Sequence, residues 1–275
     1  MTMEIKVSII MGIFNCVETL PEAIDSLLGQ TFQEWELILC DDGSTDNPYS
    51  VAEEYALRYP NKIVLIRNST NMGLNYTLNH CLKYAKGEYI ARMDGDDLSL
   101  PMRLETEVKF LNEHPEYAIV STPMIYFDEQ GEWGKGTAIE IPQIKDFVFH
   151  TPFHCHAPCM IRREAYEAVG GYTVDRRLLR FEDCNLWYKL YAAGYRGYNL
   201  QEPLYKMRDD RNAYHRRTPS ARIRGVYVQW VGFRLIHMPM RYYPFLVLEF
   251  LKDLAIILVP EGLYTTLHKR KLKRH

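Results

Sequence analysis

The chain has 275 residues, of which 47% are apolar and 25% charged, a composition that is ordinary for a globular protein and excludes a disordered or low-complexity chain. Its six cysteines are scattered, which indicates reduced thiols in a cytosolic protein rather than a disulfide scaffold. The N-terminus lacks the layout of a signal peptide, and no charge-free apolar run reaches the ~18 residues that a membrane span needs.

The formal net charge of −2 conceals an uneven distribution. Residues 206–275 contain 15 of the 33 Lys and Arg residues and 5 of the 35 Asp and Glu residues, a net charge of +10, so residues 1–205 carry −12. A basic end on an acidic body predicts that this end meets a negative surface. Its basic and aromatic residues match no nucleic-acid-binding module, so we expect no nucleic-acid partner.

Strand and helix patterns alternate through the first half of the chain. The expected strands are 7–11, 35–40, 63–66, 88–93 and 117–124, and the expected helices are about 20–28, 47–59, 73–86 and 101–113. The first helix begins with Thr19-x-x-Glu22, a pattern typical of a capping box. This alternation predicts an α/β fold with a doubly wound, mostly parallel sheet.

Acidic clusters follow the second and fourth of these strands. Asp41 and Asp42 end the second strand, and Asp94-Gly95-Asp96-Asp97 follows the fourth. Because ligands bind outside the carboxyl ends of parallel strands, we expect both clusters to face one crevice, with a solvated turn as the alternative. The first cluster could accept hydrogen bonds from a ribose or a pyrimidine, and the second could hold Mg²⁺ or Mn²⁺ on phosphates.

The loop after the first strand narrows the choice of nucleotide-binding protein. Its sequence, Met11-Gly12-Ile13-Phe14-Asn15-Cys16, matches neither the dinucleotide-binding glycine motif nor the P-loop. The sequence therefore argues against a dinucleotide oxidoreductase and a P-loop phosphotransferase. It predicts a nucleotide site without a glycine cradle.

Seven short motifs occur in order over about residues 5–210. They are Val7-Ser8-Ile9-Ile10-Met11…Asn15, Gln30-Thr31-Phe32, Asp41-Asp42-Gly43-Ser44-Thr45-Asp46, Asn71-x-Gly73-Leu74, Gly87-Glu88-Tyr89-Ile90-Ala91-Arg92-Met93-Asp94-Gly95-Asp96-Asp97, Val169-Gly170-Gly171-Tyr172 and Glu182-Asp183-x-x-Leu186. Together they resemble the family-two glycosyltransferases of the GT-A fold. The resemblance is strongest to the branch that builds bacterial capsular and O-antigen polysaccharides.

The resemblance implies a metal-dependent inverting glycosyltransferase that uses a nucleotide-sugar donor, which we expect to be a UDP-sugar. Asp41 and Asp42 would hold the uracil or ribose. Asp94 would lie near the ribose, and Asp96 would bind the cofactor, Mn²⁺ or Mg²⁺. Asp97 is expected to support this loop beside the substrate.

The same resemblance assigns residues of the acceptor side. Asp183 is expected to be the catalytic base, with Glu182 beside it as a substrate contact, and helix N-terminal capping is the alternative for this pair. His156 lies in a segment that matches a loop lining the acceptor site, and we expect it to contact the substrate. Zinc ligation with neighbouring His and Cys residues and plain packing are the alternatives for His156.

The stretch after Tyr205 is expected to close over the diphosphate, as the resemblance implies. His215 is the candidate metal ligand in this stretch. Arg208 and Arg211 are the candidate phosphate ligands. A solvated charged loop is the alternative for all three.

We expect a glycosyltransferase domain over 1–217, with a nucleotide-sugar half at 1–97 and an acceptor half at 98–217, and a helical tail at 218–275. The tail is amphipathic and basic, which favours a cytoplasmic protein bound peripherally to the anionic inner face of the plasma membrane. A homodimer through the C-terminal helices is the alternative. The expected acceptor is a glycan or polyprenyl-linked glycan, and a non-catalytic nucleotide-sugar-binding or scaffolding subunit is the rival function.

Overall fold

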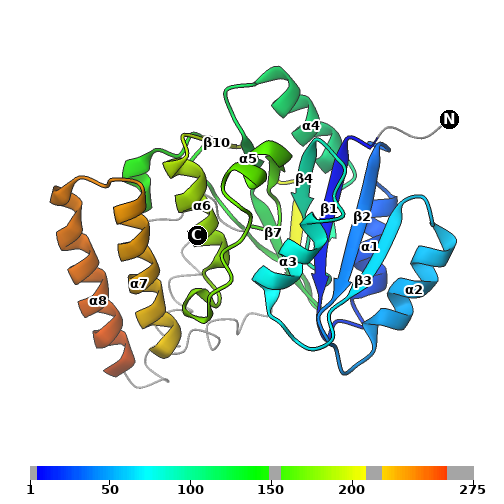
Figure 1. Cartoon of the computed structure of the whole chain (residues 1–275), viewed down its shortest axis with the longest axis horizontal. Helices are drawn as coiled ribbons and strands as arrows, with labels where there is room; N and C mark the ends of the chain where they lie inside the picture. Colours follow the sequence, from blue (N-terminus) through cyan, green and yellow to red (C-terminus); the bar gives the residue numbers. More distant parts are fainter. Residues whose placement is uncertain (1–4, 149–155, 209–218, 259–275) are drawn as a thin grey trace.

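A computed structural model of the chain describes residues 5–148, 156–208 and 219–258 (Figure 1). The roles expected for Arg211 and His215 fall outside these described residues. So does the domain boundary expected after residue 217.

Seven strands make the central sheet, and they alternate with helices along the chain. Their bounds are β1 (Val7–Ile13), β2 (Trp35–Asp41), β3 (Ile63–Arg67), β4 (Tyr89–Arg92), β6 (Ile119–Ser121), β9 (Met160–Arg162) and β10 (Gly197–Asn199). They lie in the order β10-β6-β9-β4-β1-β2-β3, and every pair is parallel except the two that β9 makes with β4 and β6. The expected mostly parallel, doubly wound sheet is confirmed.

A second sheet of four short strands stands beside the first. Its strands are β5 (Leu98–Ser99), β7 (Met124–Asp128), β8 (Gly131–Lys135) and β11 (Tyr205–Arg208), in the order β5-β11-β7-β8. The single strand expected at 117–124 is instead β6 and the start of β7, one in each sheet. Pro123 lies between β6 and β7. Proline has no N–H to donate to a neighbouring strand, so it interrupts the strand at this point. Since β11 pairs with β5, the second sheet brings Arg208 close to the acidic turn after β4.

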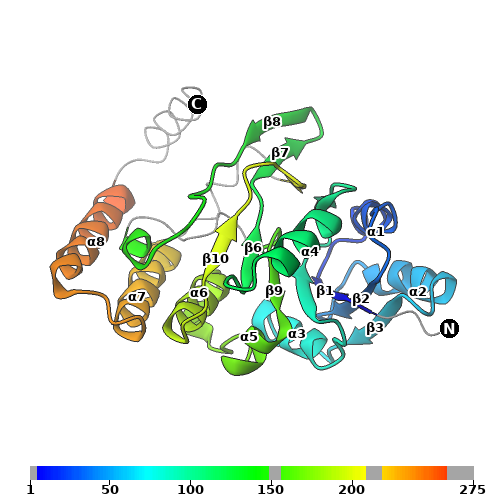
Figure 2. The same ribbon diagram turned by 90° about the horizontal axis from the view of Figure 1, so that it is seen from above.

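Helices cover both faces of the central sheet. The α-helices are α1 (Leu20–Leu28), α2 (Pro48–Arg58), α3 (Leu74–Leu82), α4 (Arg103–Glu113), α5 (Arg163–Ala168), α6 (Glu182–Ala192), α7 (Pro219–Leu235) and α8 (Tyr243–Leu258), and the 3₁₀ helices are η1 (Ile144–Val148), η2 (Arg176–Leu178) and η4 (Met240–Tyr242). Figure 2 shows α1, α2 and α4 on one face and α3, α5 and α6 on the other. Within the described ranges, every helix is too short or too polar to cross a bilayer.

Each face of the sheet has its own apolar core, because successive side chains of a strand point to opposite faces. On β1, Ile9 packs with Leu27 of α1 and Leu104 of α4, whereas Ile10 packs in the other core with Leu78 of α3 and Leu186 of α6. The strand patterns that predicted β1 therefore reflect burial on both sides, as is usual in parallel sheets.

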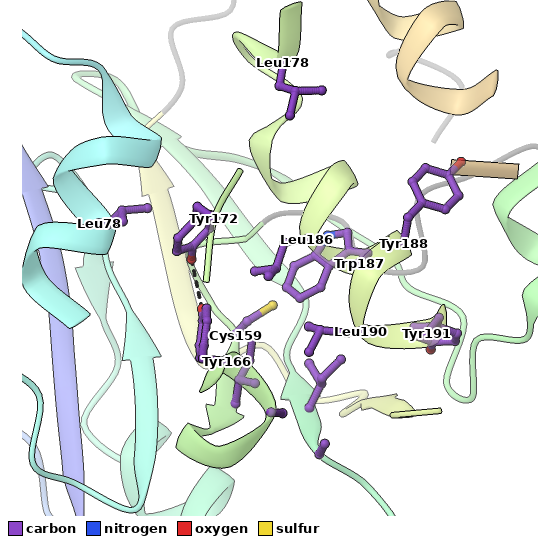
Figure 3. Close-up of a cluster of buried hydrophobic side chains, with 14 of the residues drawn as sticks. Leu78, Cys159, Tyr166, Tyr172, Leu178, Leu186, Trp187, Tyr188, Leu190 and Tyr191 are labelled. Carbon is purple, nitrogen blue, oxygen red and sulfur yellow. Dashed lines mark hydrogen bonds between the residues drawn. The ribbon is translucent and has the colours of Figure 1, made fainter. Parts of the chain in front are cut away.

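The helix α6 is held in place by an aromatic cluster and by α7. Trp187 is fully buried, and it belongs to the same core cluster as Tyr166 and Tyr172, whose hydroxyl groups meet in the close-up of this core (Figure 3). On the other side of α6, a Cβ atom at Gly232 of α7 would stand 2.2 Å from the ring of Tyr188. The two helices thus pack in very close contact, which fixes where the N-terminus of α6 lies.

The capping box expected at the start of α1 does not form, so this prediction was wrong. The Thr19 hydroxyl donates to the carbonyl oxygens of Cys16 and Gly95, at 3.3 and 3.0 Å, instead of capping a helical N–H. Glu22 forms an ion pair with Arg208. The Thr19 hydroxyl binds the turn after β4 and the Glu22 carboxylate pairs with Arg208 of β11, so neither side chain caps the helix.

Candidate active site

A pocket of about 470 Å³ opens at the carboxyl ends of β1, β2 and β4. It is lined by Gly12, Phe14, Asn15, Cys16, Val17, Glu18, Thr19, Asp46, Asp94, Gly95, Asp96 and Arg208. This is the edge where parallel sheets bind their ligands. Among the described residues that line it, four are carboxylates and Arg208 is the single cation.

The wall of the pocket is built by two loops that hydrogen-bond to each other. Asn15 has a left-handed backbone with φ of 51°, which asparagine tolerates better than most residues. Its side-chain oxygen accepts the N–H of Thr45 at 2.9 Å, and its own N–H donates to the Ser44 hydroxyl at 3.1 Å. The Asp46 carboxylate accepts the N–H of Val17 at 2.9 Å. These bonds join the loop after β1 to the loop after β2 and preform the wall.

Asp94 and Asp96 reach the pocket from the turn after β4. The Arg92 guanidinium holds Asp94 with two parallel hydrogen bonds, one of 2.9 Å from Nη1 to Oδ2 and the other from Nη2 to Oδ1. The Asp96 side chain opens into the pocket, yet desolvation by the surrounding walls, and then repulsion from Asp94, raise its pKa. A cation placed beside Asp96 would relieve both effects.

Asp97 is buried behind this turn and does not line the pocket. Its Oδ2 accepts the Tyr205 hydroxyl at 2.9 Å, and its Oδ1 accepts the N–H of Arg208 at 2.8 Å. Burial, followed by the charges of Asp94 and Asp96, raises its pKa well above the ordinary value. Asp97 thus ties β11 to the acidic turn, close to the position where the loop was expected to need support.

Asp41 and Asp42 are buried at the same edge of the sheet, but neither is among the side chains that line the pocket. The Asp42 carboxylate accepts the backbone N–H groups of Met72 and Gly73, at 2.8 and 2.9 Å, and the Asn68 amide at 2.8 Å. It therefore organises the loop before α3. The structure brings Asp94 and Asp96 to the pocket, and places Asp42 one loop away from it.

The pair Glu182 and Asp183 forms the first turn of α6. Asp183 is half-buried, and its Oδ1 accepts the N–H of the next residue, Cys184, at 2.7 Å. The residue that precedes the helix, Phe181, forms no side-chain cap. Burial raises the pKa of both carboxyls, and for Glu182 the charge of Asp183 adds to it. Oε2 of Glu182 is buried and makes no hydrogen bond within the described part of the chain.

One buried arginine connects the two acidic groups. Arg92, 5% exposed, binds Asp94 directly, and its charge partly offsets the burial that raises the pKa of Asp96, Glu182 and Asp183. Asp94 and Asp96 line the pocket, whereas Glu182 and Asp183 lie at the start of α6 and are not among its lining residues.

His156 lies in the aromatic cluster that supports α6, away from the pocket. Its Nε2 is 2.7 Å from the Tyr172 hydroxyl, which is 2.9 Å from that of Tyr166 (Figure 3). Its ring meets Trp187 edge-on at 5.2 Å, and burial lowers the pKa of this histidine well below its ordinary value. Across the described residues, no three His, Cys, Asp or Glu side chains converge as a metal site. Of the other residues considered for zinc, His150, His154 and Cys155 lie outside that part of the chain, and Cys159 is described as a buried free thiol.

Sequence reasoning missed the place of Arg92 and the pocket wall between β1 and α1. A signal for Arg92 was present, because a charged residue inside a short buried strand needs a partner. The wall residue Asp46 lay inside a motif that was used only for its first two aspartates. No local pattern joins Glu22 to Arg208, which are 186 positions apart.

Comparison with protein sequences gives a consistent family. The model of the family described as "Glycosyl transferase family 2" matches residues 8–170. EpsE of Bacillus subtilis (strain 168), described as a glycosyltransferase, is 43% identical over 267 residues, which are 97% of this chain and 94% of that protein. The Escherichia coli protein WfaP, named UDP-Glc:alpha-D-GlcNAc-diphosphoundecaprenol beta-1,3-glucosyltransferase, is 27% identical over 73% of this chain and 77% of its own length.

Solved structures share the fold. TarS of S. aureus in complex with UDP-GlcNAc superposes with a TM-score of 0.67 at 18% identity, over 84% of this chain and 70% of that one. The mannosyltransferase PcManGT of Pyrobaculum calidifontis, solved with GDP-Man and Mn²⁺, gives 0.65 at 19% identity, over 98% and 80%. These likenesses confirm the expected GT-A fold. Because the family model matches more than half of its length, the chain belongs to glycosyl transferase family 2.

Proposed function

We propose that this glycosyltransferase moves a sugar, with inversion at the anomeric carbon, from a UDP-sugar to a hydroxyl of a glycan or lipid-linked glycan during polysaccharide synthesis. The observation that carries the proposal is that Asp94 and Asp96 line a pocket at the carboxyl ends of the parallel strands. Two relatives support the substrates: TarS was solved with UDP-GlcNAc, and the name of WfaP states a UDP-Glc donor and a diphosphoundecaprenol-linked acceptor.

Asp183 is the general base of the proposed reaction. It takes the proton of the acceptor hydroxyl while the hydroxyl oxygen forms a bond to the anomeric carbon. The bond from that carbon to the diphosphate oxygen breaks on the opposite face, which inverts the configuration. Burial raises the pKa of Asp183, whereas the N–H of Cys184 and then the charge of Arg92 oppose this rise and favour the ionised form that a base requires.

A divalent cation, Mn²⁺ or Mg²⁺, fits the acidic turn as a cofactor. Asp96 offers a carboxylate open to the pocket and raised in pKa by a like charge, which is the environment that favours a bound cation. Within the described chain no three-ligand protein site exists, so donor phosphate oxygens and water would complete the coordination, as is usual for Mg²⁺. When bound, the ion supplies positive charge that stabilises the departing diphosphate.

The base-binding role of Asp41 and Asp42 is part of the same proposal. Asp42 Oδ2 accepts one hydrogen bond, from Gly73 at 2.9 Å, and a carboxylate oxygen can accept a second. A uracil N–H or a ribose hydroxyl is a suitable donor. Asp42 lies one loop away from the pocket, and Asp46, from the same loop after β2, lines it.

The membrane surface is the proposed location of the acceptor, and α8 is the proposed contact. Five of its apolar side chains are 37–58% exposed and cover about 160° of the helix at 100° per residue, an arc without charge. They are Val247, Leu248, Phe250, Leu251 and Leu254. Two C-terminal regions, each carrying +10 over residues 206–275, would repel each other in a homodimer through this face, whereas an anionic leaflet attracts them.

Calorimetric titration with UDP tests the donor site. We expect the purified protein to bind UDP with Mn²⁺ and to lose binding in EDTA. Asp183→Asn should bind UDP as the wild type does and lose transfer by at least about 100-fold, since it removes only the base. Metal-dependent UDP binding by a wild type that transfers no sugar to lipid-linked acceptors would favour the rival scaffolding function.

Vesicle flotation tests the membrane contact. The wild type should float with vesicles that contain anionic lipid and stay in solution with neutral ones. Leu248→Glu combined with Leu251→Glu should abolish flotation. Leu57→Glu on α2, where the leucine is 77% exposed, is the matched control and should float normally. Equal flotation of all variants, or a concentration-dependent dimer that the α8 variants break, would contradict the proposal.

A further inference from the structure

The Thr19-x-x-Glu22 pattern, which fails to cap α1, makes two contacts with the donor site instead. The Thr19 hydroxyl donates to the Gly95 carbonyl oxygen at 3.0 Å, in the middle of the acidic turn. One helical turn later, Glu22 forms an ion pair with the Nη2 of Arg208 on β11. The start of α1 is thereby connected to both sides of the pocket rim.

Arg208 is fixed at its backbone and along its side chain. Its N–H donates to Asp97 Oδ1 at 2.8 Å, and its Nε donates to the carbonyl oxygen of Asp96 at 2.9 Å. The guanidinium carbon stands 4.5 Å from the centre of the Phe127 ring, and Nη2 meets Glu22. A guanidinium has five N–H donors, so these contacts set its plane and leave about three donors for another acceptor.

The charged residues that line the pocket are mostly acidic, so an anionic ligand would depend on Arg208 for a favourable charge interaction. Among the described residues lining it, Glu18, Asp46, Asp94 and Asp96 are acidic, and Arg208 alone is basic. A diphosphate that enters such a pocket needs the cation to be in place beforehand, because ordering a free arginine at the moment of binding lowers the affinity.

We propose that Glu22 is a positioning residue for the donor: it orients the Arg208 guanidinium so that its remaining N–H groups face the diphosphate of the nucleotide-sugar. This inference rests on the proposed function. Glu22 could alternatively compete with the diphosphate for Arg208. The Asp96 carbonyl and the Phe127 ring hold the guanidinium at the rim independently, so Glu22 sets its orientation instead of drawing it out of the pocket.

A positioning role predicts that Glu22→Ala weakens UDP binding, whereas competition for Arg208 predicts that it strengthens UDP binding. A direct test is therefore possible. UDP and uridine are titrated with Mn²⁺ present into the wild type, Glu22→Ala, Glu22→Gln and Arg208→Ala, and into the double variant with alanine at both positions. We expect Glu22→Ala to weaken UDP binding by about three- to tenfold and to leave uridine unchanged, since uridine has no phosphate. Glu22→Gln, which can still accept a hydrogen bond, should lose less. In the Arg208→Ala background, Glu22→Ala should have no further effect.

A matched control separates this effect from a general change of charge. Asp25→Ala removes an acid from the same helix, but Asp25 accepts the hydroxyl of Tyr55 on α2, at 2.9 Å, and does not line the pocket. It should bind UDP as the wild type does. Thermal melts check that each variant is folded, which is expected because the Glu22 side chain is 56% exposed.

Each other outcome overturns the inference. Unchanged or tighter UDP binding by Glu22→Ala would contradict it, as would an equal loss for uridine or a full additional loss without Arg208. The proposed function fails separately: a wild type that binds neither UDP nor another nucleoside diphosphate with Mn²⁺ has no donor site. UDP binding that is the same in the wild type and Glu22→Ala would overturn the positioning role without contradicting the donor site.

Discussion

The two acidic turns at the carboxyl edge of the central sheet differ in what satisfies their carboxylates. After β2, the protein itself supplies the partners: the N–H of Ser44 and the Arg67 guanidinium for Asp41, and Asn68, Met72 and Gly73 for Asp42. After β4, Asp94 has Arg92, whereas Asp96 opens into the pocket with its pKa raised by desolvation and by Asp94. Similar acidic sequences after two parallel strands thus differ in outcome. The carboxylates after β2 are largely satisfied by partners within the protein, whereas the turn after β4 keeps negative charge facing the pocket.

The difference arises from residues far away in the chain. The donors that complete Asp42 lie 26 to 31 positions later, in the loop that leads into α3. The turn after β4 instead faces a wall contributed by the loop after β1, whose side chains include no second cation among the described lining residues. The number of protein partners that a carboxylate cluster receives therefore depends on which loop folds over it.

The largest expected effect comes from Asp96→Asn. We expect it to lower the affinity for UDP with Mn²⁺ by about 100-fold, roughly 2.7 kcal/mol, because it removes the carboxylate open to the metal. Without metal, its melting temperature should equal or exceed that of the wild type, since the repulsion from Asp94 is gone. Calorimetry and thermal melts measure both quantities. UDP binding that survives in EDTA would show that this turn needs no cation.

Asp42→Asn should lower the free energy of unfolding. The amide keeps one acceptor, but its NH₂ group faces one of the backbone N–H groups of Met72 and Gly73, so at least one buried donor is left without a partner. We expect a loss of about 1–3 kcal/mol in urea unfolding. A variant that unfolds like the wild type would contradict the contrast between the two turns.

The repeating units of the fold were predictable because their signals are local. Apolar runs such as Val7–Met11 predicted β1, and the spacing of Leu20, Ile24 and Leu27 predicted α1, because each pattern reports burial on the face of one element. β9 was missed: Met160–Arg162 has three residues and joins the sheet only through antiparallel pairing with β4 and β6, which are distant in sequence. Long-range pairing leaves little trace in so short a segment.

The candidate site was predictable to a similar degree. The acidic turn after β4 was recognised from its motif and lines the pocket. Glu22 was interpreted as a helix cap, because the same Thr-x-x-Glu spacing fits a capping box whenever no tertiary partner is known. His156 was interpreted through a loop resemblance, whereas its neighbours in space are Tyr172 and Trp187. Residues whose partners come from other elements could not be assigned from their own neighbourhood.

A smaller effect, dependent on pH, is expected for Asp97→Asn in the absence of metal. The pKa of Asp97 is raised by burial and then by Asp94 and Asp96, so its folded pKa exceeds its unfolded value. Its contribution to stability is therefore present below the unfolded pKa and is lost as the pH rises through the folded pKa. Relative to the wild type, the variant should gain stability as the pH rises from the unfolded pKa of Asp97 toward its higher folded pKa.

Urea unfolding in EDTA at several pH values measures this difference. Asp46→Asn is a useful control for the removal of a nearby negative charge, because Asp46 lines the pocket from the turn after β2 and accepts the N–H of Val17. A wild-type advantage that grows with pH would mean that Asp97 is stabilised as the anion. The turn after β4 would then be as well satisfied as the turn after β2.

The smallest effect is expected for Arg67→Gln. Arg67 Nε is 3.0 Å from Oδ2 of the buried Asp41, but that oxygen accepts no well-aligned hydrogen bond, and the arginine side chain is 54% exposed. Because solvent screens such a pair, we expect a loss of about 0.5 kcal/mol or less in urea unfolding, and less still at high salt. A loss above about 1.5 kcal/mol would mean that Asp41 depends on an outside charge. The turn after β2 would then share the charge imbalance of the turn after β4, and the contrast between them would rest on Asp42 alone.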